Sequence, residues 1–276
     1  MERRFRQVDV FAESPQAGNP LAVVIDGEGL STDEMQRFAN WTNLSETTFL
    51  LPPTGSEADY RVRIFTPVGE LPFAGHPTLG SCRVWLDAGG RPQGDDVIVQ
   101  ECEAGMIPIG RASDRLSFRA PPLIRSGPVD DTTLARAMAQ LGIEPSSLVD
   151  AAWIDNGPGW LGLLLPDAEA VLAVDPGPVD LKLGLIGPHR PGREAAFELR
   201  AFFPKDGSTV EDPVTGSLNA SAAGWLLESG RASAPYLATQ GTAIGRSGRV
   251  YITTDDDGQV WVGGAVMTTI VGTVEL

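Results

Sequence analysis

The stretch Arg63-Ile-Phe-Thr-Pro67, followed by Pro72-Phe-Ala-Gly75-His76, decides the fold, because a similar stretch occurs again in the second half of the chain. The second copy is Arg200-Ala-Phe-Phe-Pro204, followed by Pro213-Val-Thr-Gly216-Ser217. In both copies an apolar, helix-like segment follows the leading glycine and ends at another glycine after the same number of residues. The repeated order of strand, loop, glycine turn and buried helix indicates a duplicated α+β unit, with two related halves facing each other.

Around these copies the chain reads mainly as short strands. Runs rich in β-branched or aromatic residues end near Gly, Pro or Asp, which is typical of strands joined by tight turns. These runs are 5–11, 21–25, 47–51, 60–65, 97–101, 116–119, 160–165, 195–203, 249–254, 260–262 and 268–275. Ser31 opens a capping-box pattern that predicts a helix to about Trp41, and a second helix is predicted from Thr132 to Leu141, where Gly142 stops it. The segment from about 119 to 131 contains three prolines and a glycine and is interpreted as an interdomain linker.

Composition narrows the class of partner. The 276 residues carry 21 basic and 36 acidic side chains, a net charge of −15, which argues against binding to nucleic acid or to an anionic membrane. No apolar stretch approaches the roughly 20 residues that span a bilayer, and no signal peptide is visible, so we expect a cytoplasmic protein. Cys82 and Cys102 match no metal motif and are expected to be buried free thiols.

The two glycine turns are the first candidates for chemistry. The beginning of a helix exposes unpaired backbone N–H groups and a partial positive charge, and a glycine there lets a ligand approach the backbone closely. Turns led by Gly75 and Gly216 would therefore bind a carboxylate between them. Phosphate is less favoured because neither turn has a glycine-rich phosphate motif or a nearby lysine, and no metal-ligand spacing is present in the sequence.

Several polar residues lie near these turns, and each has an ordinary structural interpretation as well. His76, at a helix start, should be neutral and could relay a proton or cap the helix. Glu46 could be an acid/base or a solvated residue at the start of a strand. Asp212 and Ser217 could act on a substrate or stabilise a helix start. His189 is expected to be a solvated loop residue.

Two further polar segments are explained by turn chemistry alone. These are Gly18-Asn19-Pro20 and Asn156-Gly157-Pro158, in both of which the residue types are those of tight turns.

The motifs together resemble the phenazine-biosynthesis isomerase (PhzF-like) family. The resemblance starts at Asp9-Val-Phe11 and Gly18-Asn19-Pro20-Leu-Ala-Val and continues through Leu44-Ser-Glu46-Thr-Thr-Phe. It includes Arg63-Ile-Phe-Thr-Pro67, Glu70-Leu-Pro-Phe-Ala-Gly-His-Pro-Thr-Leu-Gly80, Glu211-Asp-Pro-Val-Thr-Gly-Ser217, and Gln240-Gly241 with Gly245-Arg246 and Gly248. These motifs occur in the family's order nearly from end to end.

The resemblance implies a diaminopimelate epimerase-like α+β fold of two pseudo-symmetric domains, each a curled, mostly antiparallel sheet around a central helix. We expect domains at 1–120 and 121–265, with the site in the cleft between them. The last strand, at about 266–276, is a candidate to complete the first domain.

The resemblance also implies an activity: a cofactor-independent, metal-free isomerase that shifts a proton, and with it a double bond, on a small carboxylate-bearing substrate. Glu46 would shuttle the proton, and His76 and Asp212 would complete the catalytic set. Substrate binding is expected from Ser217, Gly75, Gly216, Thr215, Gly18 and Asn19. A homodimer is expected from the resemblance alone.

Three alternatives stay open. A one-base epimerase or a dehydratase would use the same Glu46, whereas a two-thiol racemase is disfavoured because Cys82 falls inside a helix. Ser217, His76 and Asp212 are also the residue types of a hydrolase triad, although no nucleophile-elbow motif surrounds the serine. A non-catalytic ligand-binding protein is the third alternative.

Overall fold

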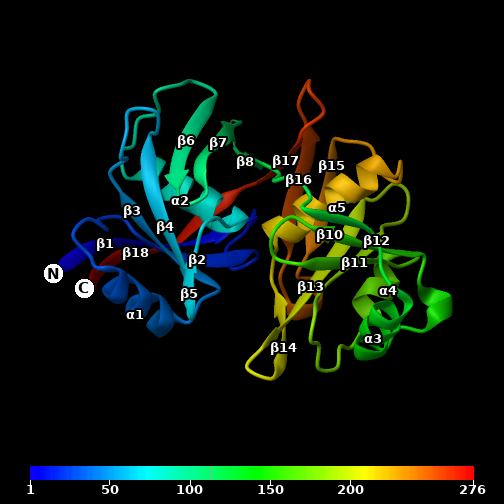
Figure 1. Cartoon of the computed structure of the whole chain (residues 1–276). Helices are drawn as coiled ribbons and strands as arrows, with labels where there is room; N and C mark the ends of the chain where they lie inside the picture. Colours follow the sequence, from blue (N-terminus) through cyan, green and yellow to red (C-terminus); the bar gives the residue numbers. More distant parts are fainter. Residues whose placement is uncertain (113) are drawn as a thin grey trace. The chain divides into compact units, whose positions relative to one another are not determined.

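The computed structural model describes residues 1–112 and 114–276. The chain forms two compact units, unit 1 with residues 1–119 and 263–276 and unit 2 with residues 120–262. In this described part of the chain, no helix is both long enough and apolar enough to cross a membrane. Figure 1 shows the elements in chain order.

Unit 1 is a sheet that curls around helix α2. Its elements are β1 (Glu2–Val10), β2 (Asn19–Val24), α1 (Thr32–Thr42), β3 (Glu46–Leu51), β4 (Tyr60–Thr66), β5 (Gly69–Leu71), α2 (Gly75–Asp87), β6 (Val97–Cys102), β7 (Gly105–Arg111), β8 (Leu116–Arg119) and β18 (Val266–Glu275). Helix α2 contacts strands β1, β2, β3, β4, β6, β8 and β18, so it is the central helix of the unit. Helix α1 packs on β3 and β4, where Met35, Phe38 and Ala39 join a core with Phe49 and Phe65.

Unit 2 is built in the same way around helix α5. Its elements are β9 (Arg125–Pro128), α3 (Asp131–Leu141), the 3-10 turn η1 (Pro145–Ser147), β10 (Asp150–Asp155), β11 (Trp160–Leu164), α4 (Ala168–Ala173), β12 (Lys182–Pro188), β13 (Phe197–Lys205), β14 (Ser208–Asp212), α5 (Gly216–Glu228), β15 (Tyr236–Gln240), the 3-10 turn η2 (Thr242–Ile244), β16 (Gly248–Thr254) and β17 (Val260–Gly264), which crosses the unit boundary. A large core lies between the sheet and helices α3 and α4, and it includes Leu163, Leu185 and Phe202.

The strand pairings confirm the duplication predicted from the sequence. In unit 1, β1–β2 is antiparallel, β2–β3 parallel, β3–β4 and β4–β5 antiparallel, β4–β6 parallel and β6–β7 antiparallel. Strands β10 to β16 of unit 2 repeat this pattern pair by pair. Helices α2 and α5 occupy the same place in each pattern, and both have 13 residues.

An ion pair is duplicated together with the backbone. The guanidinium of Arg63 on β4 forms two hydrogen bonds of 2.6 Å with Glu70 on β5. Arg200 on β13 binds Glu211 on β14 in the same bidentate way, at 3.0 and 2.8 Å. The second pair is more deeply buried, and Arg200 also donates to the carbonyl oxygen of Val171 in helix α4. Each pair closes the hairpin that leads into a central helix.

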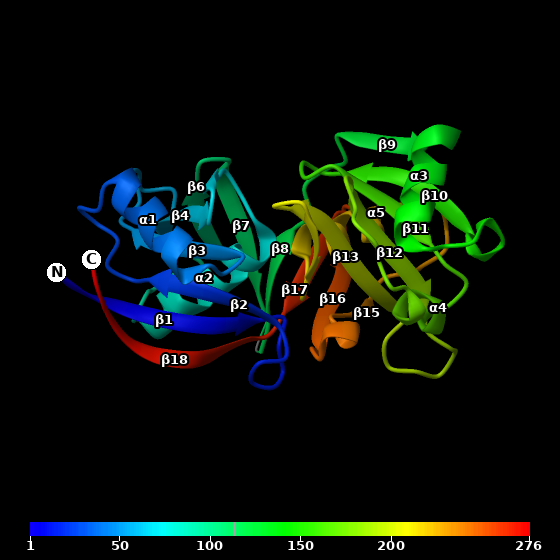
Figure 2. The ribbon, with the colours of Figure 1, turned by 90° about the horizontal axis from the view of Figure 1, so that it is seen from below.

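The last strand of each repeat is exchanged between the units. Strand β9 follows β8 along the chain but pairs antiparallel with β10 of unit 2. Strand β18 follows β17 but pairs antiparallel with β1, from Glu2 opposite Glu275 to Val10 opposite Val266. Figure 2 shows β1 in blue and β18 in red side by side. The linker predicted at 119–131 is therefore wrong in part, because Arg125–Pro128 form a strand of unit 2.

Candidate functional site

In unit 1 the fold brings Glu46 and His76 together. Glu46 is the first residue of β3, and His76 is in the first turn of α2. The Nε2 atom of His76 lies 3.3 Å from a carboxylate oxygen of Glu46. The exposed fractions of the two side chains are 7% for His76 and 16% for Glu46, so Glu46 is not the solvated strand-start residue that its local sequence also allowed.

The contact between helix α2 and strand β3 fixes this geometry. Ser81 donates a hydrogen bond of 2.9 Å from its hydroxyl to Thr48 Oγ1, and both side chains are fully buried. At Gly80 an added Cβ would lie 2.5 Å from Leu21 on β2, so the helix packs closely on the sheet. The start of α2 is therefore held at a fixed distance from the start of β3.

Burial controls the charge of the histidine. It lowers the pKa of His76 from 6.5 to about 3, so the imidazole is neutral at neutral pH. The sequence had predicted a neutral ring from the helix dipole, whereas here the cause is desolvation. A neutral imidazole at this distance lies against the Glu46 carboxylate and limits the orientations that it can adopt. This pair can accept a proton from a carbon acid and return it.

The Gly18-Asn19 segment lies at the start of β2, next to β3. The backbone N–H of Gly18 faces both carboxylate oxygens of Asp9, at 3.2 and 3.1 Å. A Cβ on Gly18 would lie 2.0 Å from the carbonyl oxygen of Val10, so only glycine fits. Asn19 is completely buried, and the parallel register places Leu21 opposite Glu46. The segment is thus close to the Glu46 end of β3.

In unit 2 the structure brings Asp212, Thr215, Gly216 and Ser217 together around the start of α5. Thr215 is the N-cap residue, but its hydroxyl caps no backbone group of the helix. It donates instead to Asp212 Oδ2 at 2.5 Å. The carboxylate is therefore held at the helix start, where the positive end of the helix dipole favours a negative charge.

Two residues that sequence reasoning had not assigned to the site contact Ser217. Trp160 donates from its indole Nε1 to Ser217 Oγ at 2.9 Å. The side-chain amide of Asn156 donates to the Ser217 carbonyl oxygen at 3.1 Å. From the sequence, Asn156 was explained by turn chemistry alone. The only signal in the sequence that this loop is unusual is the pair Gly157 and Gly159, which both adopt positive φ angles.

The other candidates lie in different surroundings. His189 is not the solvated loop residue that was predicted, because its side chain is 19% exposed and its Nε2 lies 3.0 Å from Thr239 Oγ1 and 3.4 Å from Glu198. Cys82 and Cys102 are buried free thiols, as predicted. Among the described residues, no group of three or more His, Cys, Asp or Glu side chains is placed to hold a metal ion.

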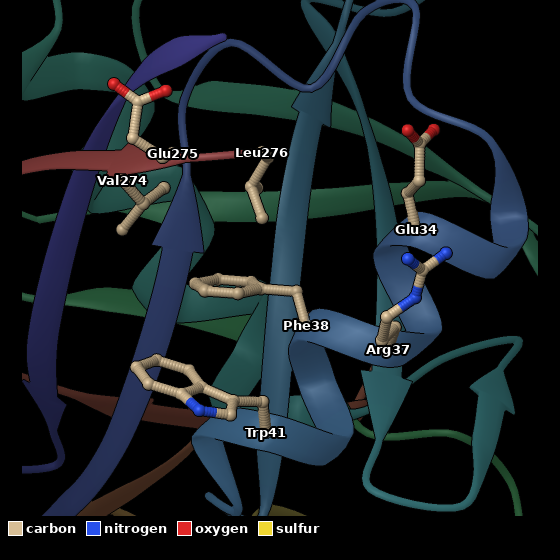
Figure 3. Close-up of a pocket in the computed structure, with 7 residues that line it drawn as sticks. All are labelled: Glu34, Arg37, Phe38, Trp41, Val274, Glu275 and Leu276. Atoms are coloured by element: carbon tan, nitrogen blue, oxygen red, sulfur yellow. The ribbon is translucent and has the colours of Figure 1, made fainter.

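An apolar pocket of about 470 Å³ lies elsewhere on unit 1, between helix α1 and the end of β18. Phe38 and Trp41 line it together with the end of β18, as Figure 3 shows. Trp41 stacks on Phe38 at 6.1 Å between ring centroids and is 78% exposed. None of the predicted site residues lines this pocket, so it is not the candidate active site.

Comparison with known proteins places this geometry in a family. The profile of the phenazine biosynthesis-like proteins (PhzC-PhzF) matches residues 8–272. Antisense-enhancing sequence 1 of Schizosaccharomyces pombe is 36% identical, with 98% of each chain covered. The trans-2,3-dihydro-3-hydroxyanthranilate isomerase of Pseudomonas aeruginosa is 33% identical, with 93% of this chain and 92% of the relative covered.

The solved structures agree with the sequence comparisons. A phenazine biosynthesis protein of the PhzF family from Enterococcus faecalis superposes with a TM-score of 0.82 at 25% identity, over 100% of both chains. The fold is α+β and diaminopimelate epimerase-like, as predicted from the sequence. With its duplicated units, its glycine-led central helices and a profile match over nearly its whole length, the chain belongs to the phenazine biosynthesis-like (PhzC-PhzF) protein family.

Proposed function

We propose that this protein is a cofactor-independent isomerase that moves a proton between two carbons of a small, carboxylate-bearing substrate, with Glu46 as the acid/base. The observation that carries the proposal is the 3.3 Å contact between the largely buried Glu46 carboxylate and His76 Nε2. A carboxylate in such surroundings is poised for proton transfer, because removal from water raises the cost of its charge. Relatives that are named isomerases of trans-2,3-dihydro-3-hydroxyanthranilate support the same class of reaction.

Each remaining site residue has a role in this proposal. His76 orients the Glu46 carboxylate and shares its proton. Asp212 is the second catalytic carboxylate. Ser217, Thr215, Gly216, Gly75, Gly18 and Asn19 bind the substrate, and Gly75 and Gly216 present backbone N–H groups of a helix start to its carboxylate.

Proton transfer can be followed directly with deuterium. The purified protein is incubated with trans-2,3-dihydro-3-hydroxyanthranilate in D2O, and the carbons are observed by NMR. We expect loss of a proton at one carbon and gain of deuterium at another. Glu46→Gln should slow this exchange by about 10²- to 10⁴-fold. Glu57→Gln, the same change at an exposed site, is the matched control and should keep the wild-type rate.

The alternatives give different results in the same set of experiments. Deuterium gained at the carbon that lost the proton would identify a one-base epimerase. Stoichiometric labelling of Ser217 by a fluorophosphonate would favour a hydrolase. Exchange that continues unchanged in Glu46→Gln would overturn the assignment of the acid/base.

A further inference from the structure

The Gln240-Gly241 motif, with Gly248, has no role in the proton transfer itself. Gln240 is the last residue of β15 and is completely buried. Its side-chain amide makes four hydrogen bonds, all to the segment from Asp212 to Asn219. When a buried side-chain amide forms all of its possible hydrogen bonds with one segment, it fixes the conformation of that segment.

The directions of these hydrogen bonds follow from their partners. The backbone N–H of Thr215 can only donate, so the atom 3.0 Å from it is Gln240 Oε1, which also accepts from Asn219 at 2.8 Å. The carbonyl oxygen of Asp212 can only accept, so the atom 3.1 Å from it is Nε2. The second Nε2 hydrogen goes to Thr215 Oγ1 at 2.9 Å.

The Thr215 hydroxyl thus accepts from Gln240 and has its single hydrogen left to donate. It donates this hydrogen to Asp212 Oδ2, at 2.5 Å. The hydrogen bonds from Gln240 to Thr215 and from Thr215 to Asp212 therefore have a fixed donor-to-acceptor direction. They keep one carboxylate oxygen of Asp212 as an acceptor and fix the direction in which the carboxylate points.

The two glycines bring the same segment close to β15 and β16. A Cβ on Gly241, whose φ is +88°, would lie 2.6 Å from the carbonyl oxygen of Pro213. A Cβ on Gly248 would lie 2.3 Å from Val214 Cγ2. Gly241 is needed because the Pro213 carbonyl oxygen lies against it, and Gly248 because the Val214 side chain and the Gln240 carbonyl oxygen do.

We propose that Gln240 is a positioning residue of the active site, which orients the Asp212 carboxylate through the Thr215 hydroxyl. Gly241 and Gly248 allow the Asp212–Gly216 segment to pack closely against this part of the sheet. The inference builds on the proposed function, because it assumes that Asp212 acts on the substrate. Gln240 itself touches no reacting atom in this proposal.

Unit 1 supplies an internal comparison. Gln100 lies on β6, the strand that corresponds to β15, two residues before the position equivalent to Gln240, and it is equally buried. It donates to Thr78 Oγ1 at 3.0 Å and accepts from the Tyr60 hydroxyl at 2.8 Å, and neither bond reaches a catalytic carboxylate. Thr78 on α2 is the counterpart of Asn219 on α5, since each lies three residues after its leading glycine. Gln100 thus anchors a central helix without orienting a carboxylate.

The test compares Gln240→Met, Thr215→Val, their double variant, Thr215→Ser and Gln100→Met in the full chain. Steady-state kinetics with trans-2,3-dihydro-3-hydroxyanthranilate give kcat and KM, and urea unfolding gives stability. We expect Gln240→Met and Thr215→Val each to lower kcat by on the order of 100-fold, the effect of a misplaced group, with a smaller change in KM. The double variant should lose no more than either single variant, since both break one chain of hydrogen bonds.

The remaining variants separate positioning from stability. Thr215→Ser keeps the hydroxyl and should restore most of the kcat that Thr215→Val loses. Gln100→Met should lose stability as Gln240→Met does, but its kcat should stay at the wild-type value. An equal loss of kcat in Gln100→Met, or additive losses in the double variant, would show that Gln240 has only a structural role.

A measurement without substrate keeps this inference distinct from the proposed function. In crystal structures of Gln240→Met and Thr215→Val, the Asp212 carboxylate should rotate away from residue 215, and in Gln240→Met the Thr215 amide should exchange its hydrogen faster. An unchanged Asp212 rotamer in both variants overturns the positioning role whatever the activity. A wild-type protein that does not convert the substrate overturns the proposed function, while the rotamer still decides the role of Gln240.

Discussion

His76 Nε2 and a carboxylate oxygen of Glu46 are 3.3 Å apart, and the two residues come from different elements, a helix start and a strand start. The two residues are 30 positions apart in the sequence, but their side chains lie together in a largely buried part of unit 1. The histidine is neutral there because burial lowers its pKa to about 3. Its protonation is therefore linked to the stability of the fold.

The stability of the protein should depend on pH through His76. The pKa is 6.5 in an unfolded chain and about 3 in the folded one, so between these values the unfolded state binds a proton that the folded state does not. Stability contributed by the neutral ring is complete above pH 6.5 and falls as the pH drops toward 3, by at most about 1.4 kcal/mol per pH unit. Urea unfolding of the wild type and of His76→Gln between pH 7 and pH 4 gives the free energy of unfolding of each protein as a function of pH. Parallel curves for the two proteins would contradict it.

The duplicated ion pairs should differ in their contribution to stability. Removing one partner of a buried pair leaves an uncompensated charge and costs about 3–5 kcal/mol. The Arg200 and Glu211 side chains are 6% and 10% exposed, so we expect a loss of this size in Glu211→Gln. The Arg63 and Glu70 side chains are 25% and 26% exposed, and Glu70→Gln should cost clearly less because water screens the remaining charge. Free energies of unfolding from urea titrations test the order, and an equal cost would refute it.

Both thiols should be unreactive in the folded protein. Burial raises the pKa of Cys82 to about 12 and also raises that of Cys102. The thiolate is the nucleophile, so alkylation by iodoacetamide at pH 8 should label neither cysteine until the protein is unfolded in urea. Mass spectrometry counts the labels. Rapid labelling of folded Cys82 would revive the two-thiol racemase as an alternative.

Gly18 should be among the positions least tolerant of substitution. In Gly18→Ala the new Cβ would lie 2.0 Å from a backbone oxygen of Val10, so strand β1 or β2 must move. We expect a loss of more than about 2 kcal/mol, as for other severe backbone strains and overpacked sites. In Gly69→Ala the new Cβ would meet no atom within 4 Å, and this variant should be close to wild type. Thermal unfolding of the two variants gives the comparison, and similar midpoints would contradict the expected clash.

Local patterns in the sequence were sufficient for much of the fold. The capping box at Ser31 is present, with Ser31 and Glu34 bonded reciprocally, because it depends only on neighbouring residues. Gly142 ends helix α3 in a left-handed conformation, as predicted. The repeated glycine turns gave two central helices of equal length. These features need no knowledge of distant contacts.

Features that depend on partners far away in the sequence were missed. Strand β9 looked like a linker because the segment 119–131 around it contains three prolines and a glycine, and only pairing with β10 makes it a strand. His189 appeared solvated because nothing in its loop indicates the buried Glu198 on the neighbouring strand. The role of Gln240 was invisible for the same reason, since all four of its bonds reach residues more than 20 positions away.

The pairing of β18 with β1 has a consequence for the order of folding during synthesis. The amino-terminal unit leaves the ribosome with one side of its first strand uncovered, and the residues that cover it are translated only after the whole of 120–262. Until β18 has been synthesised, the nascent amino-terminal unit is incomplete, and the backbone groups on one edge of β1 are exposed to solvent or chaperones. Completion of the first unit therefore depends on the synthesis of unit 2 and of β18.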